Sequence, residues 1–406
     1  MRTTLALALL SSVAACGGGG DPDLRAERAI PADLAPDVQA AAVANNQFAL
    51  DALAALPSDG PNQFFSPFSI STALWMLDAG ARGETDAELR AALRATLPGD
   101  RAHLAYGAML TSLDVGRGYE LYTLATANRL FGQKGYTFQQ PFLDLLANAY
   151  GAPLEELDFS GDPEGSRRHI NGWVSDQTDQ KIPELLEQLS STNRLSIVNA
   201  ILFKGQWTTP FDRSKTRAAP FQVAAGTSVD APMMTKSEDL ATAAIAGGRI
   251  GLLPFRGNDL SMVVLLPDEV DGLPALERAL TAEGLEAAIA AAAPAGNDAM
   301  VVALPKFSFE TKFDLTGPLS DLGIQAAFDA GRADLSGIAP GLFVSSAVHK
   351  AVITVDEEGA EAAAATAINL EDSLPPEFRA DRPFAFFIYD HVTHGILFLG
   401  RVTDPR

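Results

Sequence analysis

The sequence DEEGAEAAAATAINLE, at residues 356–371, follows a strand-like run at 351–355 and departs from ordinary globular patterning. By propensity, an Ala-rich chain with interspersed Glu favours a helix, here followed by a polar, Pro-containing loop at 369–380. Its alternation instead suits a strand with small side chains on one face, which could slide between existing strands. The residues alone leave both interpretations open. The uncharged face of such a strand would comprise Ala360, Ala362, Ala364, Thr366, Ile368 and Leu370.

Outward from this stretch, local patterns predict helices early in the chain and strands late. Amphipathic spacing occurs at 37–56, 69–77 and 86–96, the second of these after the start signal Ser66-Pro67. Apolar or β-branched runs predict strands at 196–203, 261–266 and 301–304, and the runs at 384–388 and 395–399 suit a C-terminal hairpin. An Ala-rich stretch at 286–293 predicts a surface helix. This order of elements favours an α+β fold with large sheets.

The composition excludes several classes of protein. The 406 residues are 47% hydrophobic and 20% charged, which is enough apolar material for a large core and excludes a disordered or fibrous chain. The net charge is −21, and like charges repel, so nucleic acid is not an expected partner of the fold. The single cysteine, Cys16, excludes an intramolecular disulfide and a cysteine zinc site.

The N-terminus carries features of an export signal. Arg2 precedes an apolar run at 5–10 that is too short to span a bilayer, and the run leads to Val13-Ala14-Ala15-Cys16. This ending resembles the bacterial lipobox, whose cysteine is lipidated and becomes the mature N-terminus; the alternative is an ordinary cleaved signal. We expect a signal peptide at 1–15 and a Gly- and Pro-rich flexible tether at 16–36. The protein would be exported as an outer-membrane lipoprotein facing the periplasm or the cell surface, or would be extracellular.

Motifs of common enzymes are absent from the sequence. It contains no G-x-S-x-G nucleophile elbow, no phosphate-binding P-loop and no H-E-x-x-H metal motif. Among the five histidines, His391 and His394 are three residues apart but lie between two predicted strands with no carboxylate motif beside them, which favours turn residues over metal ligands. We therefore expect no metal, no cofactor and no catalytic residues. A scattered Ser/His/Asp triad is an open but unsupported alternative.

A series of short motifs, each weak alone, runs in order through the rest of the chain. They include FFSPFSIS at 64–71, GARGET at 80–85, INGWV at 170–174, VNAILFKG at 198–205, LPKF at 304–307, ADLSG at 333–337, EEG at 357–359 and LFLGR at 397–401. Together they resemble the serpins over nearly all of residues 37–406. The resemblance implies one serpin domain at 37–406, with three β-sheets, eight or nine helices and an exposed reactive-centre loop.

The resemblance also implies a function, that of a monomeric suicide inhibitor rather than an enzyme. A target serine-type endopeptidase, or a cysteine-type one, attacks the loop and forms an acyl-enzyme. The cleaved loop then enters the main sheet as a new strand and traps the protease. The alternative from another class is a non-inhibitory serpin that acts as a cell-surface binding or chaperone-like protein. The uncharged inner face of the hinge favours the inhibitor, because burying charge during insertion is costly.

Functional residues follow from the matched motifs. The region where the central strands part would contain Ser66, Ser69, Asn199 and His349. The top of the sheet, where the hinge enters, would contain Trp207, Lys306 and Glu357, with an ion pair between the last two. The hinge itself would comprise Glu357, Glu358, Gly359, Ala360, Glu361, Ala362, Ala363, Ala364, Ala365, Thr366 and Ala367.

The scissile bond has two candidate positions. Counting forward from Glu357 by the loop length usual in serpins gives Ser373-Leu374. Counting back from Pro383 gives Asp372-Ser373. A serine there fits a protease with a small or permissive pocket, of elastase or subtilisin type. An aspartate requires a basic pocket that pairs with its carboxylate. Because insertion constrains the length of the hinge, we favour Ser373.

Overall fold

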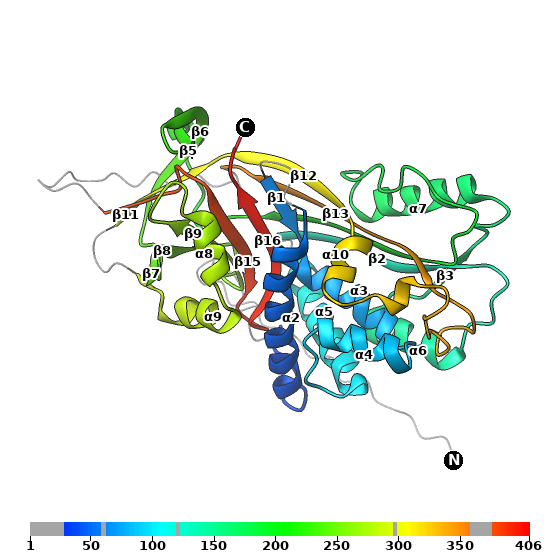
Figure 1. Ribbon diagram of the computed structural model, residues 1–406. Helices are drawn as coiled ribbons and strands as arrows, with labels where there is room; N and C mark the ends of the chain where they lie inside the picture. Colours follow the sequence, from blue (N-terminus) through cyan, green and yellow to red (C-terminus); the bar gives the residue numbers. More distant parts are fainter. Residues whose placement is uncertain (1–27, 58–61, 119–121, 295–298, 358–375) are drawn as a thin grey trace, which may run out of the picture.

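The computed structural model describes residues 28–57, 62–118, 122–294, 299–357 and 376–406, whose strands form three sheets (Figure 1). This confirms the expected α+β class. The largest part of the core lies between the helices and the sheets, and a smaller apolar cluster lies on the opposite face of one sheet. The signal and lipidation site predicted at 1–16 fall outside the described residues.

The central sheet has the strand order β12-β13-β4-β2-β3. These strands are β12 (Phe307–Asp314), β13 (Val344–Val355), β4 (Leu195–Gly205), β2 (Tyr122–Gln133) and β3 (Glu155–Leu157). β13 and β4 are parallel, whereas β12 pairs antiparallel with β13 and β2 antiparallel with β4. β4 is buried on both faces except at its C-terminal end, which explains why its sequence is a continuous apolar run rather than an alternating one.

The second sheet is antiparallel and contains the expected C-terminal hairpin. β15 (Phe384–Asp390) and β16 (Gly395–Val402) pair around a turn in which His394 adopts a positive φ of 60°. The other strands of this sheet are β1 (Asn62–Phe65), β7 (Ala241–Ile245), β8 (Gly248–Pro254), β9 (Leu260–Pro267) and β10 (Ala293–Pro294). The third sheet contains β5 (Arg217–Ala224), β6 (Thr227–Glu238), β11 (Met300–Pro305) and β14 (Glu377–Arg379).

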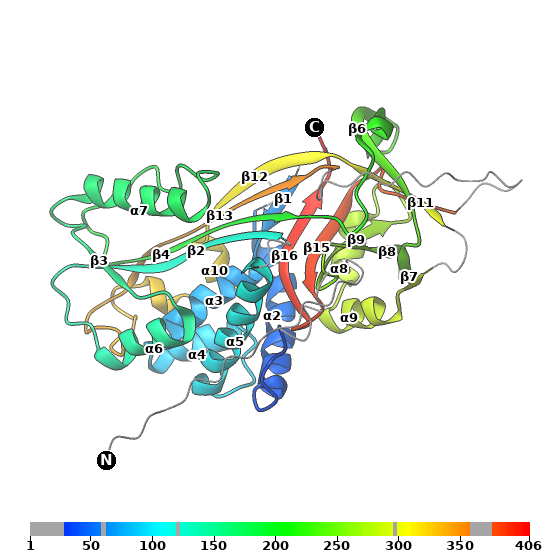
Figure 2. The ribbon, with the colours of Figure 1, turned by 180° about the vertical axis from the view of Figure 1, so that it is seen from behind.

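Helices cover both faces of the central sheet. Figures 1 and 2 show α3, α5 and α6 on one face and α7 on the other. α3 begins where the sequence predicted, because Ser66 caps it by accepting the amide hydrogen of Ser69 at 3.0 Å and Pro67 follows. The helices are α2 (Ala35–Ala55), α3 (Pro67–Asp78), α4 (Gly83–Ala92), α5 (Gly99–Gly118), α6 (Gln140–Tyr150), α7 (Pro163–Gln177), α8 (Leu273–Ala279), α9 (Ala282–Ala291) and α10 (Thr316–Asp321).

The folded part begins earlier than the boundary expected at residue 37. Arg28 is fully buried, Ile30 packs against the main core, and Leu34 donates its amide hydrogen to Pro31 O at 2.9 Å. Residues 28–36 therefore belong to the folded body, and the flexible tether assigned to 16–36 was too long. Composition suggested a tether because residues 29–36 are largely small or polar. The partners that bury Arg28 lie far away in the sequence.

Candidate functional site

The site is the seam between β13 and β4 in the middle of the central sheet. The two parallel strands pair directly from Ser346 opposite Ser196 to Ile353 opposite Phe203. The alternating, Ala-rich stretch 356–371 follows directly in the sequence after the C-terminal end of β13 at Val355. If that chain folded back between β13 and β4, it would run antiparallel to both strands.

A row of polar side chains, buried except for the partly exposed Asn128, crosses this seam. Asn128, Asn199 and His349 occupy paired positions on β2, β4 and β13. Asn199 Nδ2 donates to Ser69 Oγ at 2.9 Å, and Ser69 Oγ donates to Asn128 Oδ1 at 2.8 Å. Ser66, the cap of α3, donates its backbone N–H to His349 Nε2 at 3.1 Å. The four residues expected where the strands part are thus in one network that also includes Asn128.

His349 holds the two strands together as a neutral imidazole. Burial lowers its pKa to about 3, and its Nε2 accepts a hydrogen bond, so the proton resides on Nδ1. Nδ1 then donates to Asn199 Oδ1 across the β13–β4 seam. Parting the strands breaks this hydrogen bond and leaves both groups in need of new partners.

The C-terminal end of β13 is fixed by a second group of contacts. Lys306 Nζ lies 2.8 Å from Glu357 Oε2, so the expected ion pair is present. Thr216 Oγ1 donates to the other oxygen of Glu357 at 2.8 Å, and Phe211 donates its amide hydrogen to Glu357 O at 3.2 Å. Trp207 Nε1 donates to Asp356 O at 3.0 Å. These contacts hold the first residues of the hinge at the C-terminal end of β13.

Glu357 is ionised in this setting. Its side chain is only 6% exposed, and burial alone would raise its pKa. The hydrogen bonds from Lys306 and Thr216 outweigh burial and bring the pKa of Glu357 below its ordinary value. The charge therefore stabilises the docked hinge at neutral pH.

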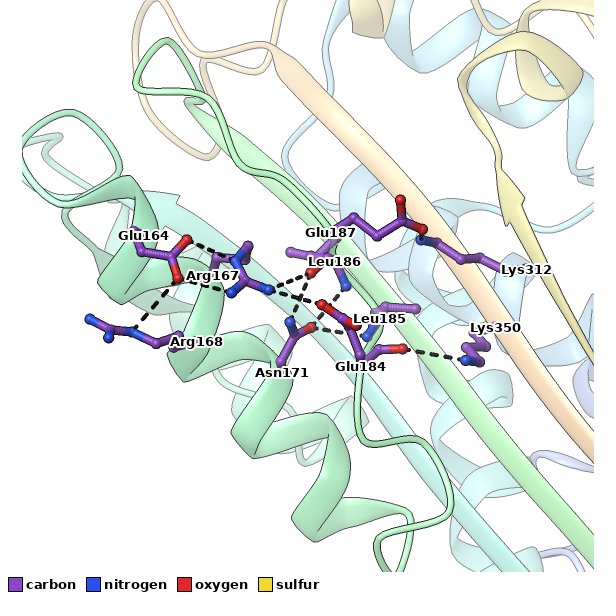
Figure 3. Close-up of polar contacts among 10 residues, drawn as sticks. All are labelled: Glu164, Arg167, Arg168, Asn171, Glu184, Leu185, Leu186, Glu187, Lys312 and Lys350. Atoms are coloured by element: carbon purple, nitrogen blue, oxygen red, sulfur yellow. Dashed lines mark hydrogen bonds and ion pairs between the residues drawn. The ribbon is translucent and has the colours of Figure 1, made fainter.

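On the face of the central sheet opposite α3, α5 and α6, α7 and the segment after it cover the half of the seam farther from the hinge. Figure 3 shows Asn171 on α7 bound to this segment: its Oδ1 accepts from the amides of Leu185 and Leu186, and its Nδ2 donates to Leu186 O. The segment is linked to β12 by an ion pair between Glu187 and Lys312 at 2.7 Å, and to β13 by Lys350 Nζ, which donates to Glu184 O. A strand entering the seam would pass beneath this cover.

Several predicted residues lie outside the described part of the chain. These are the hinge beyond Glu357, from Glu358 to Ala367, and the candidate scissile residues Asp372, Ser373 and Leu374. Conversely, sequence reasoning missed Asn128, Thr216 and Phe255. Phe255 stacks on Trp207 with ring centroids 4.7 Å apart. Asn128 interrupts an otherwise β-type run in β2, a polar residue in a central strand that could have drawn attention to it.

The two histidines at the C-terminal turn have ordinary structural partners. His391 Nε2 lies 2.9 Å from Ser261 Oγ, and His394 Nδ1 lies 3.0 Å from Glu286 Oε1. In the described ranges, no group of three or more His, Cys, Asp or Glu side chains is placed to hold a metal ion. No helix in those ranges is both long enough and apolar enough to cross a bilayer.

Comparisons with known proteins agree with this architecture. A family model described as serpin (serine protease inhibitor) matches residues 43–405. A leukocyte elastase inhibitor from Bos taurus is 41% identical over 379 residues, covering 89% of this chain and 98% of that protein. Serpin B6 from Pongo abelii is 38% identical over 373 residues, covering 90% and 99%. The crystal structure of uncleaved ovalbumin superposes with a TM-score of 0.81 at 31% identity, covering 90% of this chain and 99% of that one.

Proposed function

The chain belongs to the serpin family, and on that premise we propose that it inhibits serine-type endopeptidases, or cysteine-type ones, as a suicide substrate. The observation that carries this proposal is the directly paired parallel seam between β13 and β4, with the alternating stretch 356–371 attached to its end. The seam is closed and hydrogen-bonded, but a strand placed between β13 and β4 would replace this one parallel interface with two antiparallel ones. Antiparallel pairing is slightly more stable per residue.

The reaction would begin as ordinary proteolysis. The hydroxyl oxygen of the protease serine attacks the carbonyl carbon of the scissile residue, the peptide C–N bond breaks, and the proton passes to the new α-amine. The acyl ester stays on the protease while the hinge, now free at its C-terminal end, inserts between β13 and β4. Small uncharged side chains at Ala360, Ala362 and Ala364 let the hinge enter without a steric or desolvation barrier.

The proposed scissile bond is Ser373-Leu374, and the proposed target is a protease with a small or permissive primary pocket. The similarity to proteins named leukocyte elastase inhibitors supports an elastase-type target. The competing bond, Asp372-Ser373, would direct the inhibitor to proteases that cut after acidic residues. Mass spectrometry of the C-terminal peptide released by the protease separates the two, because the fragments begin at Leu374 and Ser373 respectively.

The test of inhibition is a covalent complex. The protein is incubated with pancreatic elastase, subtilisin and a Glu/Asp-specific protease, and the products are separated on denaturing gels. We expect an SDS-stable band at the summed mass of protease and inhibitor with at least one of them. Cleavage of the loop by all three without any such band would instead support the non-inhibitory alternative.

We further propose that the protein is an exported bacterial lipoprotein, monomeric and held at the outer membrane through Cys16. The support is the sequence Val13-Ala14-Ala15-Cys16 after a short apolar run, followed by a Gly-rich stretch. Replacing the thiol in Cys16→Ser should move the protein from the membrane fraction to the soluble fraction of the producing cell. An unchanged fractionation pattern would refute the anchor.

A further inference from the structure

Arg28 is a buried charge at the N-terminal end of the described chain. Its guanidinium donates to Asp390 at 2.9 Å and lies 3.3 Å from Asp259, and all three side chains are at most 2% exposed. Its Nε donates to Ser112 O at 3.0 Å, and Ser112 Oγ donates back to Arg28 O at 2.9 Å. Arg28 therefore docks the segment 28–34 onto α5 and onto the strand ends that carry the two carboxylates.

This docking lies outside the part of the chain that the family comparison covers. The family model begins at residue 43, so Arg28 and the segment that it anchors precede the match. The two carboxylates, Asp259 and Asp390, lie within it. Without the guanidinium, both buried carboxylates would lose the cation that pairs with them, and removing one partner of a buried ion pair is strongly destabilising. The domain thus depends on a residue that composition assigned to a flexible tether.

Asp259 belongs to a turn that is linked to the hinge through residues 206–208. The turn is residues 255–260, closed by Phe255 N donating to Leu260 O at 2.9 Å. On its other side, Thr208 Oγ1 donates to Phe255 O at 2.8 Å, and Arg256 N donates to Gln206 O at 2.6 Å. The ring of Phe255 stacks on Trp207, which in turn donates to Asp356 O beside the hinge.

We propose that Arg28 is a positioning residue for the hinge. By pairing with Asp259 it holds the 255–260 turn, the turn holds residues 206–208, and Trp207 in that segment holds Asp356, which precedes Glu357 at the end of β13. Release of Arg28 loosens the top of the β13–β4 seam and lets the uncleaved loop enter the sheet spontaneously. This last consequence rests on the proposed function, whereas the loosening of the hinge contacts does not.

Hydrogen exchange of backbone amides in the full-length protein tests the link directly. Two amides report on it: Thr208 N, which donates to Pro254 O, and Phe211 N, which donates to Glu357 O. In Arg28→Ala we expect both to exchange about tenfold faster than in the wild type, because the opening free energy of the segment falls. Asp259→Ala should accelerate exchange at the same two amides while leaving the Arg28–Asp390 pair in place. This variant replaces Arg28→Ala as the test if Arg28→Ala does not fold.

Arg101→Ala is the matched control. Arg101 pairs with Asp37, a carboxylate only 5% exposed, so this variant also removes the cation from a buried acid, but the pair joins α5 to α2 rather than to the 255–260 turn. We expect it to leave exchange at Thr208 and Phe211 at the wild-type rate. Unchanged exchange at both amides in Arg28→Ala and Asp259→Ala would overturn the proposal, as would an equal acceleration in Arg101→Ala.

A second readout separates this proposal from the proposed function. On prolonged incubation, uncleaved Arg28→Ala should convert to a more heat-resistant, loop-inserted form severalfold faster than the wild type. If the wild type forms no covalent protease complex but the exchange result holds, inhibition fails and the positioning role of Arg28 stands. If covalent complexes form but amide exchange in Arg28→Ala and Asp259→Ala is unchanged, inhibition stands and the positioning role of Arg28 fails.

Discussion

His349 and Asn199 show how a few side chains hold the β13–β4 seam closed. The imidazole bridges the two strands by donating to Asn199 and at the same time accepts the amide hydrogen of Ser66 at the start of α3. Both groups are fully buried, so neither can exchange its partner for water while the sheet is closed. One residue thus couples the β13–β4 seam to the helix beneath it.

Replacing this imidazole with an apolar group should weaken the closed state. In His349→Leu, Ser66 N–H and Asn199 Oδ1 each lose a buried hydrogen-bond partner. We therefore expect the free energy of unfolding, measured in urea, to fall by about 2–4 kcal/mol. His103→Leu is the control, since His103 is also buried and bonded to a single side chain, Tyr150, but lies away from the seam. Faster spontaneous loop insertion in His349→Leu than in His103→Leu is expected. A free energy of unfolding within experimental error of the wild type would contradict this role.

The Glu357–Lys306 contact should make the docked hinge sensitive to acid. Because the folded state lowers the pKa of Glu357 below its ordinary value of 4.5, the contact contributes stability above about pH 4.5 and loses it as the pH falls through the lowered pKa. Lys306 is 43% exposed, so the contribution is at most about 1 kcal/mol.

Amide exchange at Phe211, followed from pH 7 to pH 3 and corrected for intrinsic rates, measures this effect. Wild type should be better protected than Glu357→Gln at pH 7, and the two should converge toward pH 3. A gap between them that stayed constant over this range would show that the charge of Glu357 does not hold the hinge.

At the scale of elements, the function depends on a strand that can change partners. The sequence predicts that residues of the hinge alternate between an inner and an outer face, and insertion would bury only the inner one. The seam that receives it is flanked by α7 and the segment clasped by Asn171, which must yield as the strand enters.

The alternation gives a matched pair of variants. Ala360→Arg places a charge on the inner face and should block insertion, so that the protease cleaves the loop and is released. Ala363→Arg places the same side chain on the outer face and should leave inhibition nearly unchanged. The ratio of covalent complex to cleaved inhibitor on a denaturing gel measures both. Equal ratios for the two variants would contradict insertion in this register.

Elements whose pattern is local could be predicted from the sequence. The Ser66-Pro67 start of α3, the apolar run of β4 and the C-terminal hairpin were all visible, because capping and burial leave signals within a few residues. The end of α4 was predicted wrongly. The pattern indicated a helix to residue 96, but α4 ends at Ala92 and Arg94 adopts a positive φ of 53°. Residues 93–96 include no glycine or proline that would have indicated this end. The strand order of the central sheet and the parallel pairing of β13 with β4 were not predicted, because both depend on segments about 150 residues apart in the sequence.

The whole molecule adds constraints that no local pattern carries. Arg28 is buried by Ser112 and Asp390, which are 84 and 362 residues away, so its burial could not be read from the composition of its neighbourhood. The same holds for Thr216, whose contact with Glu357 joins segments 141 residues apart. The Lys306–Glu357 ion pair could be predicted only from the family resemblance, which rests in part on the motifs at 304–307 and 357–359.

The most direct test of the central claim is the thermal stability of the protein before and after its reactive loop is cut. The loop is cleaved near Ser373 by a protease that releases its product, and both forms are melted under identical conditions. If residues 358–373 insert between β13 and β4, they add a strand with partners on both sides, and we predict that the melting temperature rises by more than about 10 °C. A cleaved form that melts at the same temperature as the intact protein, or below it, would contradict the account.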